Sequence, residues 1–236
     1  MLVGATAARP DHLLEIYLAE PYATKDATGS VAEAPTMTML GPQVDRRVSI
    51  VLGGDILTFT VAFQPAGLHV LFGLSAEALV DREASALHVS RLAAQLLHDR
   101  LRRATSFEER VAAAESWVAA RLADSAPPDA VAHAATILAR AGGRVPIREL
   151  AGRAGLSPRQ FTRRFRSQVG VAPKLYARIL RLDWVMKQRL ATPQASWTEL
   201  AHAAGYADQA HLIRDTRALC DAAPQRFFGS WACVQA

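Results

Sequence analysis

The segment Ser157–Arg166 constrains the fold of this chain more than any other stretch, because it joins a strong helix start to two chemically different faces. Serine accepts hydrogen bonds from the free amides at a helix start, and Pro158 suits the first helical turn because its φ is preset. Phe161 and Phe165 lie four residues apart and form an apolar stripe with Val169. Another face carries Arg159, Thr162, Arg163 and Arg166. One face is therefore expected to pack, and the other to contact an anion.

Residues 147–154 supply the predicted partner of this helix. They have the pattern of a short amphipathic helix ended by Gly155, and Gly155–Ser157 suits the tight turn of a helix-turn-helix. The arginine-bearing helix would then be presented to the major groove of DNA. A plain solvated basic helix explains the arginines equally well, since charge runs usually face water.

A repetition of the pattern favours the helix-turn-helix. Leu150–Gly155 returns fifty positions later as Leu200–Gly205. After one extra turn residue, Phe161–Arg166 aligns with Leu212–Arg217, and Val171–Tyr176 with Ala222–Phe227. Helical spacing over about 174–190 predicts one long helix between the units, whose length would set a separation near one DNA turn, ~34 Å. Ser196 and Glu199 form a predicted capping box for the next helix.

At this point the chain resembles the AraC/XylS-type transcriptional regulators, over roughly residues 144 to 230. The resemblance implies a double helix-turn-helix module whose two recognition helices enter successive major-groove segments on one face of DNA. The matching segments are Leu156–Arg166, Gly170–Pro173, Arg178–Leu182, Gly205–Asp215 and Pro224–Phe228.

The second unit departs from the family pattern at two positions. Thr216 stands where the first unit has Phe165, so an aromatic core residue is lost. Asp221 replaces the glycine seen as Gly170, at a place where a left-handed helix cap prefers no side chain. The second unit is therefore expected to be less stable or to engage DNA more weakly.

The distribution of charge supports a DNA partner. The chain has 236 residues and a net charge of +5. Residues 144–236 hold 15 Lys/Arg and 6 Asp/Glu, a balance of +9, whereas residues 1–143 hold 12 and 16, a balance of −4. Positive charge in the half with the repeat suits steering toward phosphate.

The length and composition predict two domains of α+β class. The paired prolines of Ser125–Asp129 interrupt helices, which places a junction there. Residues 1–126 are then a small N-terminal domain with an antiparallel sheet and helices, and residues 127–236 an all-α double helix-turn-helix domain. With no membrane-spanning apolar run and no signal peptide pattern, a cytoplasmic protein is expected.

The N-terminal half is harder to interpret. Residues 13–18 suit a short helix or strand, and the β-rich runs Val48–Leu52 and Ile56–Phe63 predict a hairpin. Residues 87–101 predict a helix with Leu92, Leu96, Leu97 and Leu101 on one face, and Ser106 begins another. Val61–Gly73, continuing to Arg82, resembles the N-terminal domain that precedes this module in many uncharacterised family members, which implies a sensor or dimerisation domain.

The resemblance assigns candidate roles to individual residues. Base contacts are expected from Arg159, Thr162, Arg163, Gln209, Ile213 and Arg214, because arginine pairs with guanine, glutamine with adenine, and isoleucine packs on a thymine methyl. The alternative for Arg163 and Arg214 is an ion pair or a phosphate contact. Phosphate contacts are expected from Arg164, Arg166 and Arg217. His69, among several phenylalanines, is a weak effector candidate whose alternative is a satisfied histidine at the edge of a core.

The leading interpretation is a bacterial, sequence-specific DNA-binding transcriptional regulator. The alternative is a signal-sensing or protein-interaction protein whose degenerate second unit no longer contacts DNA independently. An enzyme in the N-terminal half is disfavoured because no catalytic set, phosphate-binding loop or metal-ligand spacing is present in the sequence, and no cofactor is expected. The expected partner is double-stranded DNA, with RNA polymerase and a small-molecule effector as further candidates and no membrane.

Overall fold

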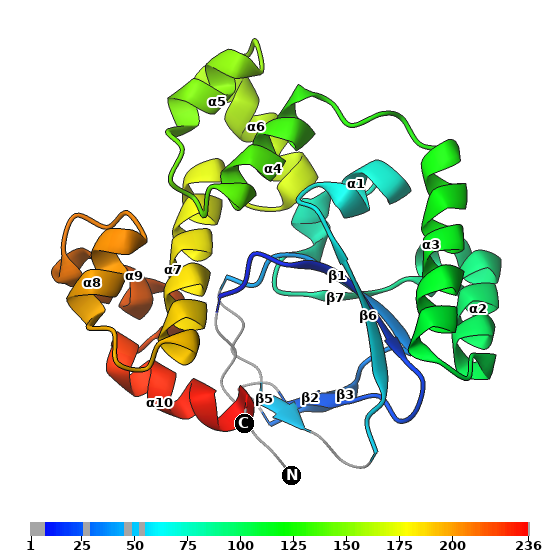
Figure 1. Cartoon of the computed structure of the whole chain (residues 1–236). Helices are drawn as coiled ribbons and strands as arrows, with labels where there is room; N and C mark the ends of the chain where they lie inside the picture. Colours follow the sequence, from blue (N-terminus) through cyan, green and yellow to red (C-terminus); the bar gives the residue numbers. More distant parts are fainter. Residues whose placement is uncertain (1–7, 26–28, 45–48, 52–54, 236) are drawn as a thin grey trace.

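The structure combines a sheet-containing N-terminal region with a C-terminal region built of helices (Figure 1). It is a computed structural model that describes residues 8–25, 29–44, 49–51 and 55–235. Antiparallel strands and flanking helices come first in the chain, and helices alone follow from residue 130. The predicted α+β class is therefore confirmed.

A four-stranded antiparallel sheet has the order β6-β1-β4-β7. Residues 13–18, predicted as a helix or a strand, contribute to the strand β1, which pairs on both sides: Leu14 lies opposite Met39 and opposite Val61. Leu14 and Ile16 are fully buried, as alternate residues of a strand with one covered face should be. The strands are β1 (His12–Tyr17), β4 (Met37–Leu40), β6 (Thr58–Phe63) and β7 (Glu83–Ser85).

A second, three-stranded sheet shows that the predicted hairpin was wrong. Its order is β3-β2-β5, formed by β2 (Ala23–Lys25), β3 (Val31–Glu33) and β5 (Ser49–Val51). β5 pairs with β2, whereas β6 pairs with β1 in the other sheet. Nearness in the chain did not decide the pairing, because β6 forms a six-residue ladder with β1 and buries Phe59 there, whereas β5 offers only three residues for pairing. Val48, Leu52 and the turn residues 53–54 lie outside the described residues.

Four helical segments belong to the N-terminal region: α1 (Gly67–Phe72), the 3₁₀ helix η1 (Ala76–Leu79), α2 (Leu87–Arg103) and α3 (Phe107–Ala123). As predicted, Ser106 caps α3, accepting a hydrogen bond from the amide of Glu109 at 3.1 Å. The apolar face predicted for α2 is wrong in part. Leu97 and Leu101 are buried, but Leu92 and Leu96 are 70% and 55% exposed, because Ala94 takes the inward position one turn before Leu97.

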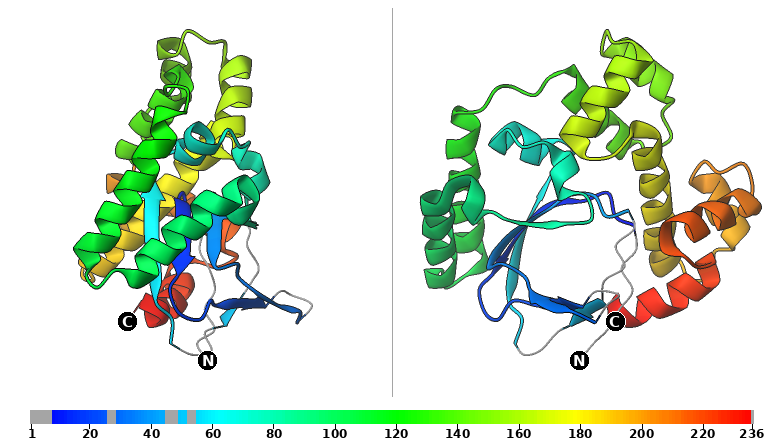
Figure 2. Two further views of the ribbon diagram at one scale, coloured as in Figure 1. Left: turned by 90° about the vertical axis from the view of Figure 1, so that its right-hand side faces the viewer. Right: turned by 180° about the vertical axis from the view of Figure 1, so that it is seen from behind.

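The C-terminal region is organised on one long helix, α7. Its helices are α4 (Ala130–Arg140), α5 (Ile147–Arg153), α6 (Pro158–Val169), α7 (Pro173–Ala191), α8 (Trp197–Ala203), α9 (Gln209–Cys220) and α10 (Pro224–Gln235). Figure 2 shows α4–α6 at one end of α7 and α8–α10 at the other. Tyr176 and Leu180 of α7 join the first core, and Leu182 and Val185 join the second.

The N-terminal region packs directly on the helical region. Ala66 belongs to the core of α4–α6, and Ala8 belongs to the core of α8–α10. His12 is 1% exposed, and its Nε2 donates to the backbone oxygen of Val169 at 3.0 Å. Tyr176 donates from its hydroxyl to the backbone oxygen of Pro10 at 3.3 Å. The two parts therefore share buried polar and apolar contacts.

Candidate DNA interface

Local sequence positions α6, the helix that the sequence predicts to contact DNA in the first unit. The Ser157 hydroxyl accepts from the amide of Gln160, and the Gln160 side chain accepts from the amide of Ser157 at 3.1 Å, which completes a capping box. Pro158 occupies the first turn, and Gly170 ends the helix with φ 99°. Phe161 and Phe165 are fully buried, with ring centroids 5.6 Å apart. This apolar stripe fixes the rotation of α6 and leaves its arginine face exposed.

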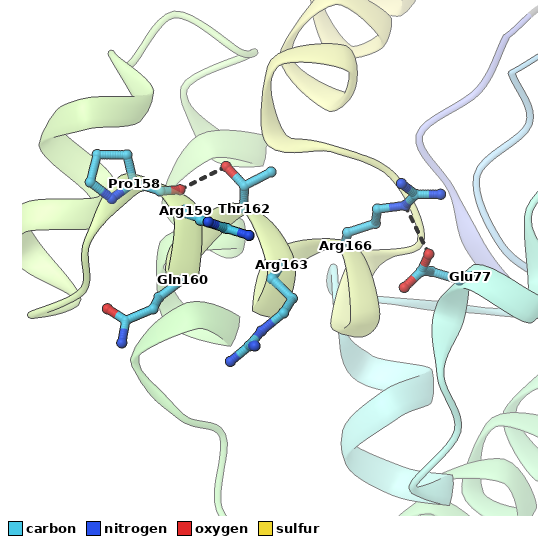
Figure 3. A pocket seen from close by; sticks show the side chains of 7 residues that line it. All are labelled: Glu77, Pro158, Arg159, Gln160, Thr162, Arg163 and Arg166. Carbon is cyan, nitrogen blue, oxygen red and sulfur yellow. Dashed lines mark hydrogen bonds and ion pairs between the residues drawn. The ribbon is translucent and has the colours of Figure 1, made fainter.

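The exposed face of α6 borders an open hollow of about 940 Å³ (Figure 3). Arg159 and Arg163 make no ion pair with any described residue, so both guanidinium groups keep their five donors for a ligand. The Thr162 hydroxyl donates back to the oxygen of Pro158 at 2.8 Å. Glu77 of η1 forms the far wall of the hollow.

The two other arginines of α6 already have protein partners. Arg164 pairs with the Asp129 carboxylate at 2.8 Å, and Arg166 pairs with Glu77 at 2.8 Å. Asp129 also caps α4, where it accepts from the amides of Val131 and Ala132. Burial raises the pKa of Asp129, but the hydrogen bonds from Ala132, Gln168 and Val131 and the charge of Arg164 outweigh burial and hold that pKa below its ordinary value. Asp129 is therefore an anion that ties α4 to α6.

Analysis of the sequence alone missed the importance of Asp129 and Glu77. For Asp129 a signal was present, because aspartate directly before an apolar helical pattern is a strong N-cap. For Glu77 none was available, since its partner Arg166 is distant in the chain and only the packing of η1 on α6 brings the two together.

The corresponding helix of the second unit, α9, has fewer exposed arginines than α6. Asp208 caps it by accepting from the amide of His211 at 2.6 Å. Gln209 accepts from the Thr198 hydroxyl of α8 at 2.9 Å through its side-chain oxygen. Arg214 and Arg217 are exposed, and Ile213 is half-buried. The predicted contact residues of α9 therefore lie on one helix. They comprise an amide, an aliphatic side chain and one arginine, whereas those of α6 are two arginines and a threonine.

The structure accommodates both departures of the second unit. Thr216 is fully buried and donates from its hydroxyl to the oxygen of Leu212 at 2.8 Å. Trp197 and Tyr206 supply aromatic bulk to this core at positions where the repeat in the first unit has Ile147 and Leu156. Asp221 ends α9 with φ 54° and ψ 21°, the left-handed conformation that glycine adopts more readily.

His69 lies on α1 and does not line the hollow beside Arg159 and Arg163. Its Nδ1 donates to the backbone oxygen of Leu74 at 2.7 Å, and its ring lines a cleft beside Gln168 of α6. In the part of the chain that the structure describes, no group of three or more His, Cys, Asp or Glu side chains could hold a metal ion. Among the same residues, no helix is both long and apolar enough to cross a membrane.

The C-terminal part thus carries two capped helices with exposed arginines at opposite ends of one long helix, an arrangement suited to contact with DNA. Comparison with known proteins agrees. Residues 150–230 match the family described as helix-turn-helix domain, and the predicted resemblance to AraC-type regulators is confirmed.

Among individual proteins, the chain is similar to the HTH-type transcriptional regulator Rv1931c of Mycobacterium tuberculosis, with 44% identity over 70 residues. That match spans 30% of this chain and 26% of the relative. The fold is similar to the crystal structure of ToxT from Vibrio cholerae O395, with a TM-score of 0.52, 10% identity, and coverage of 97% of this chain and 92% of ToxT. A ToxT structure with bound unsaturated fatty acid aligns with a TM-score of 0.50 and 11% identity, over 97% of this chain and 90% of that one.

Proposed function

We propose that this protein is a transcriptional regulator that contacts two adjacent major-groove segments of DNA through α6 and α9. The observation that carries the proposal is the pair of capped helices on α7, which join a packed face to an exposed basic face in each unit. The 19 residues of α7 span about 28 Å at 1.5 Å per residue, which suits recognition helices spaced near one DNA turn.

Base recognition by α6 is assigned to Arg159, Thr162 and Arg163, and by α9 to Gln209, Ile213 and Arg214. The exposed, unpaired guanidinium of Arg163 supports this role, because bidentate pairing with guanine needs free donors. Arg166 and Arg217 are assigned to phosphate. Arg164 can reach phosphate only in competition with Asp129.

The test is selection of DNA duplexes from a random pool by the purified protein, its Arg163→Ala variant and its Arg214→Ala variant. The expected motif is bipartite, and each substitution should relax one half at a cost of about 1–3 kcal/mol per lost pair. Arg102→Ala, on the exposed surface of α2, is the matched control and should leave the motif unchanged. Failure to enrich any motif at low salt would overturn the proposal.

A signal-sensing or protein-interaction protein is the second candidate, favoured by the altered second unit at Thr216 and Asp221. Salt dependence separates the two candidates. Binding through several phosphates must weaken steeply as salt rises, because each neutralised phosphate releases counterions. A shallow slope, or a motif that only Arg163→Ala alters, supports the second candidate.

The remaining assignments concern the rest of the chain. Residues 1–126 form the sensor or dimerisation domain and residues 127–236 the DNA-binding domain, joined by the helix-free segment between α3 and α4. The ligands named for the ToxT structures support a small-molecule effector, and RNA polymerase is the expected protein partner. A protein with this role acts where bacterial DNA lies, in the cytoplasm.

A further inference from the structure

We infer that the cleft between α1, residues 124–129 and the C-terminal part of α6 binds a small organic amine, an apolar body that carries one ammonium group. The cleft has a volume of about 460 Å³, within the usual range for small-molecule sites. Its wall joins three parts of the chain: His69 and Phe72 from α1, Asp124 and Asp129 from the segment between the domains, and Gln168 from α6.

The wall of this cleft includes a buried side chain with an unsatisfied acceptor, Gln168. Gln168 is only 7% exposed, and its Nε2 donates to the Asp129 carboxylate at 2.8 Å. Its Oε1 is buried and accepts no hydrogen bond from any described residue. A buried acceptor without a partner is unfavourable, so a ligand whose donor reaches Oε1 after a shift of the Gln168 side chain is favoured.

The other free polar atoms of the lining are acceptors too. His69 donates from Nδ1 to the oxygen of Leu74, and its Nε2 has no hydrogen-bond partner among the described residues. The exposed carboxylate of Asp124 has no ion pair with any described residue. The lining contains neither lysine nor arginine, and Arg164 nearby is engaged by Asp129.

This set of groups selects the chemistry of the ligand. An ammonium group offers three donors and a positive charge, which matches acceptors that include a carboxylate. A carboxylate ligand would face Asp124, and a guanidinium outside the lining, that of Arg121, lies over the Phe72 ring at 5.8 Å from its centroid. Val70, Leu71 and Phe72 provide an apolar wall for the body of the ligand.

The position of the cleft couples the ligand to α6. A bound amine would touch the N-terminal region and the recognition helix together, and so stabilise the arrangement in which Arg166 is paired with Glu77. This consequence rests on the proposed function. By linkage, the amine then lowers DNA affinity and DNA lowers amine affinity by the same factor.

The test is isothermal titration calorimetry of the full chain with 2-phenylethylamine, with 3-phenylpropionate as the ligand of opposite charge. The amine should bind at least tenfold more tightly than the carboxylate. Asp124→Asn and Gln168→Met should each weaken amine binding severalfold, whereas Asp99→Asn on the exposed surface of α2 should not. Asp124 is exposed, so its variant tests the site even if Gln168→Met unfolds, which thermal melting would show.

Each outcome has a definite meaning. Absence of amine binding up to millimolar concentration, equal binding of the two ligands, or an unchanged affinity in Asp124→Asn would overturn the inference. A second titration measures affinity for the selected duplex with and without amine. If the protein binds the amine but no DNA, the proposed function alone is contradicted. If it binds DNA but not the amine, only the inference about the cleft is contradicted.

Discussion

Arg166 pairs with the Glu77 carboxylate, and under the proposed function it would pair instead with a phosphate of DNA (Figure 3). The pair is largely exposed, with side chains 61% and 42% accessible, so its contribution is small, about 0.2–1 kcal/mol. Under the proposed function that amount is still enough to alter DNA affinity, because the Arg166–Glu77 pair must break before Arg166 reaches a phosphate.

Glu77→Gln should therefore raise DNA affinity, by up to about fivefold at low salt. The physical reason is the release of Arg166 together with the loss of a negative charge beside the DNA-facing hollow. Fluorescence anisotropy with the selected duplex measures the effect. Glu108→Gln, an exposed substitution of the same charge on α3, is the control, and equal behaviour of the two variants would contradict a specific role for Glu77.

At the scale of the element, α9 has an aspartate at each end, and the two are expected to act in opposite directions. Asp208 accepts a hydrogen bond at the N-terminus, where the helix dipole favours a negative charge. Asp221 stands at the C-terminus in the left-handed conformation, where both its side chain and its charge are unfavourable.

Asp221→Gly should stabilise the protein by about 0.5–1 kcal/mol, because glycine adopts φ 54° readily and removes the charge. Asp208→Ala, on the same helix, should instead destabilise it by about 1 kcal/mol through loss of the cap. Urea unfolding followed by circular dichroism measures both. A loss of stability in Asp221→Gly would show that the aspartate makes a compensating interaction.

At the scale of the whole molecule, His12 lies where the N-terminal region meets the helical region. It is buried, donates to the oxygen of Val169, and has Asp11 and Tyr176 as its ionisable neighbours. Burial lowers the pKa of His12, and the weaker opposing effects of Val169 and Asp11 do not restore it. The folded protein therefore disfavours the charged imidazole.

Stability should consequently fall as the pH drops below 6.5, the ordinary value for histidine. In that range the unfolded chain binds the proton and the folded chain does not, so protonation favours unfolding until the lowered folded-state pKa is passed. Thermal melting of the full chain between pH 5 and pH 8 checks this prediction. His12→Gln should melt lower at neutral pH but with a flatter dependence on pH, and parallel curves for the two proteins would contradict a role for His12.

The sequence by itself determined the elements whose signals are local. The helix start at Ser157, the capping box at Ser196, the buried pair Phe161 and Phe165, and the start of α3 at Ser106 all follow from spacings within one helix. The duplication predicted two matching units on either side of a long helix for the same reason, since each unit repeats its own local pattern.

Tertiary structure decided what depends on distant partners. It paired β6 with β1 rather than with β5, turned Leu92 and Leu96 outward, and brought Glu77 to Arg166 and Asp129 to Arg164. It also placed Trp197 and Tyr206 in the core of the second unit. Comparison of the two repeats alone indicated only that this core has Thr216 where the first unit has Phe165. Strand pairing and ion pairs between distant residues depend on which surfaces come into contact when the elements pack. The spacing of residues within a single element does not determine those contacts.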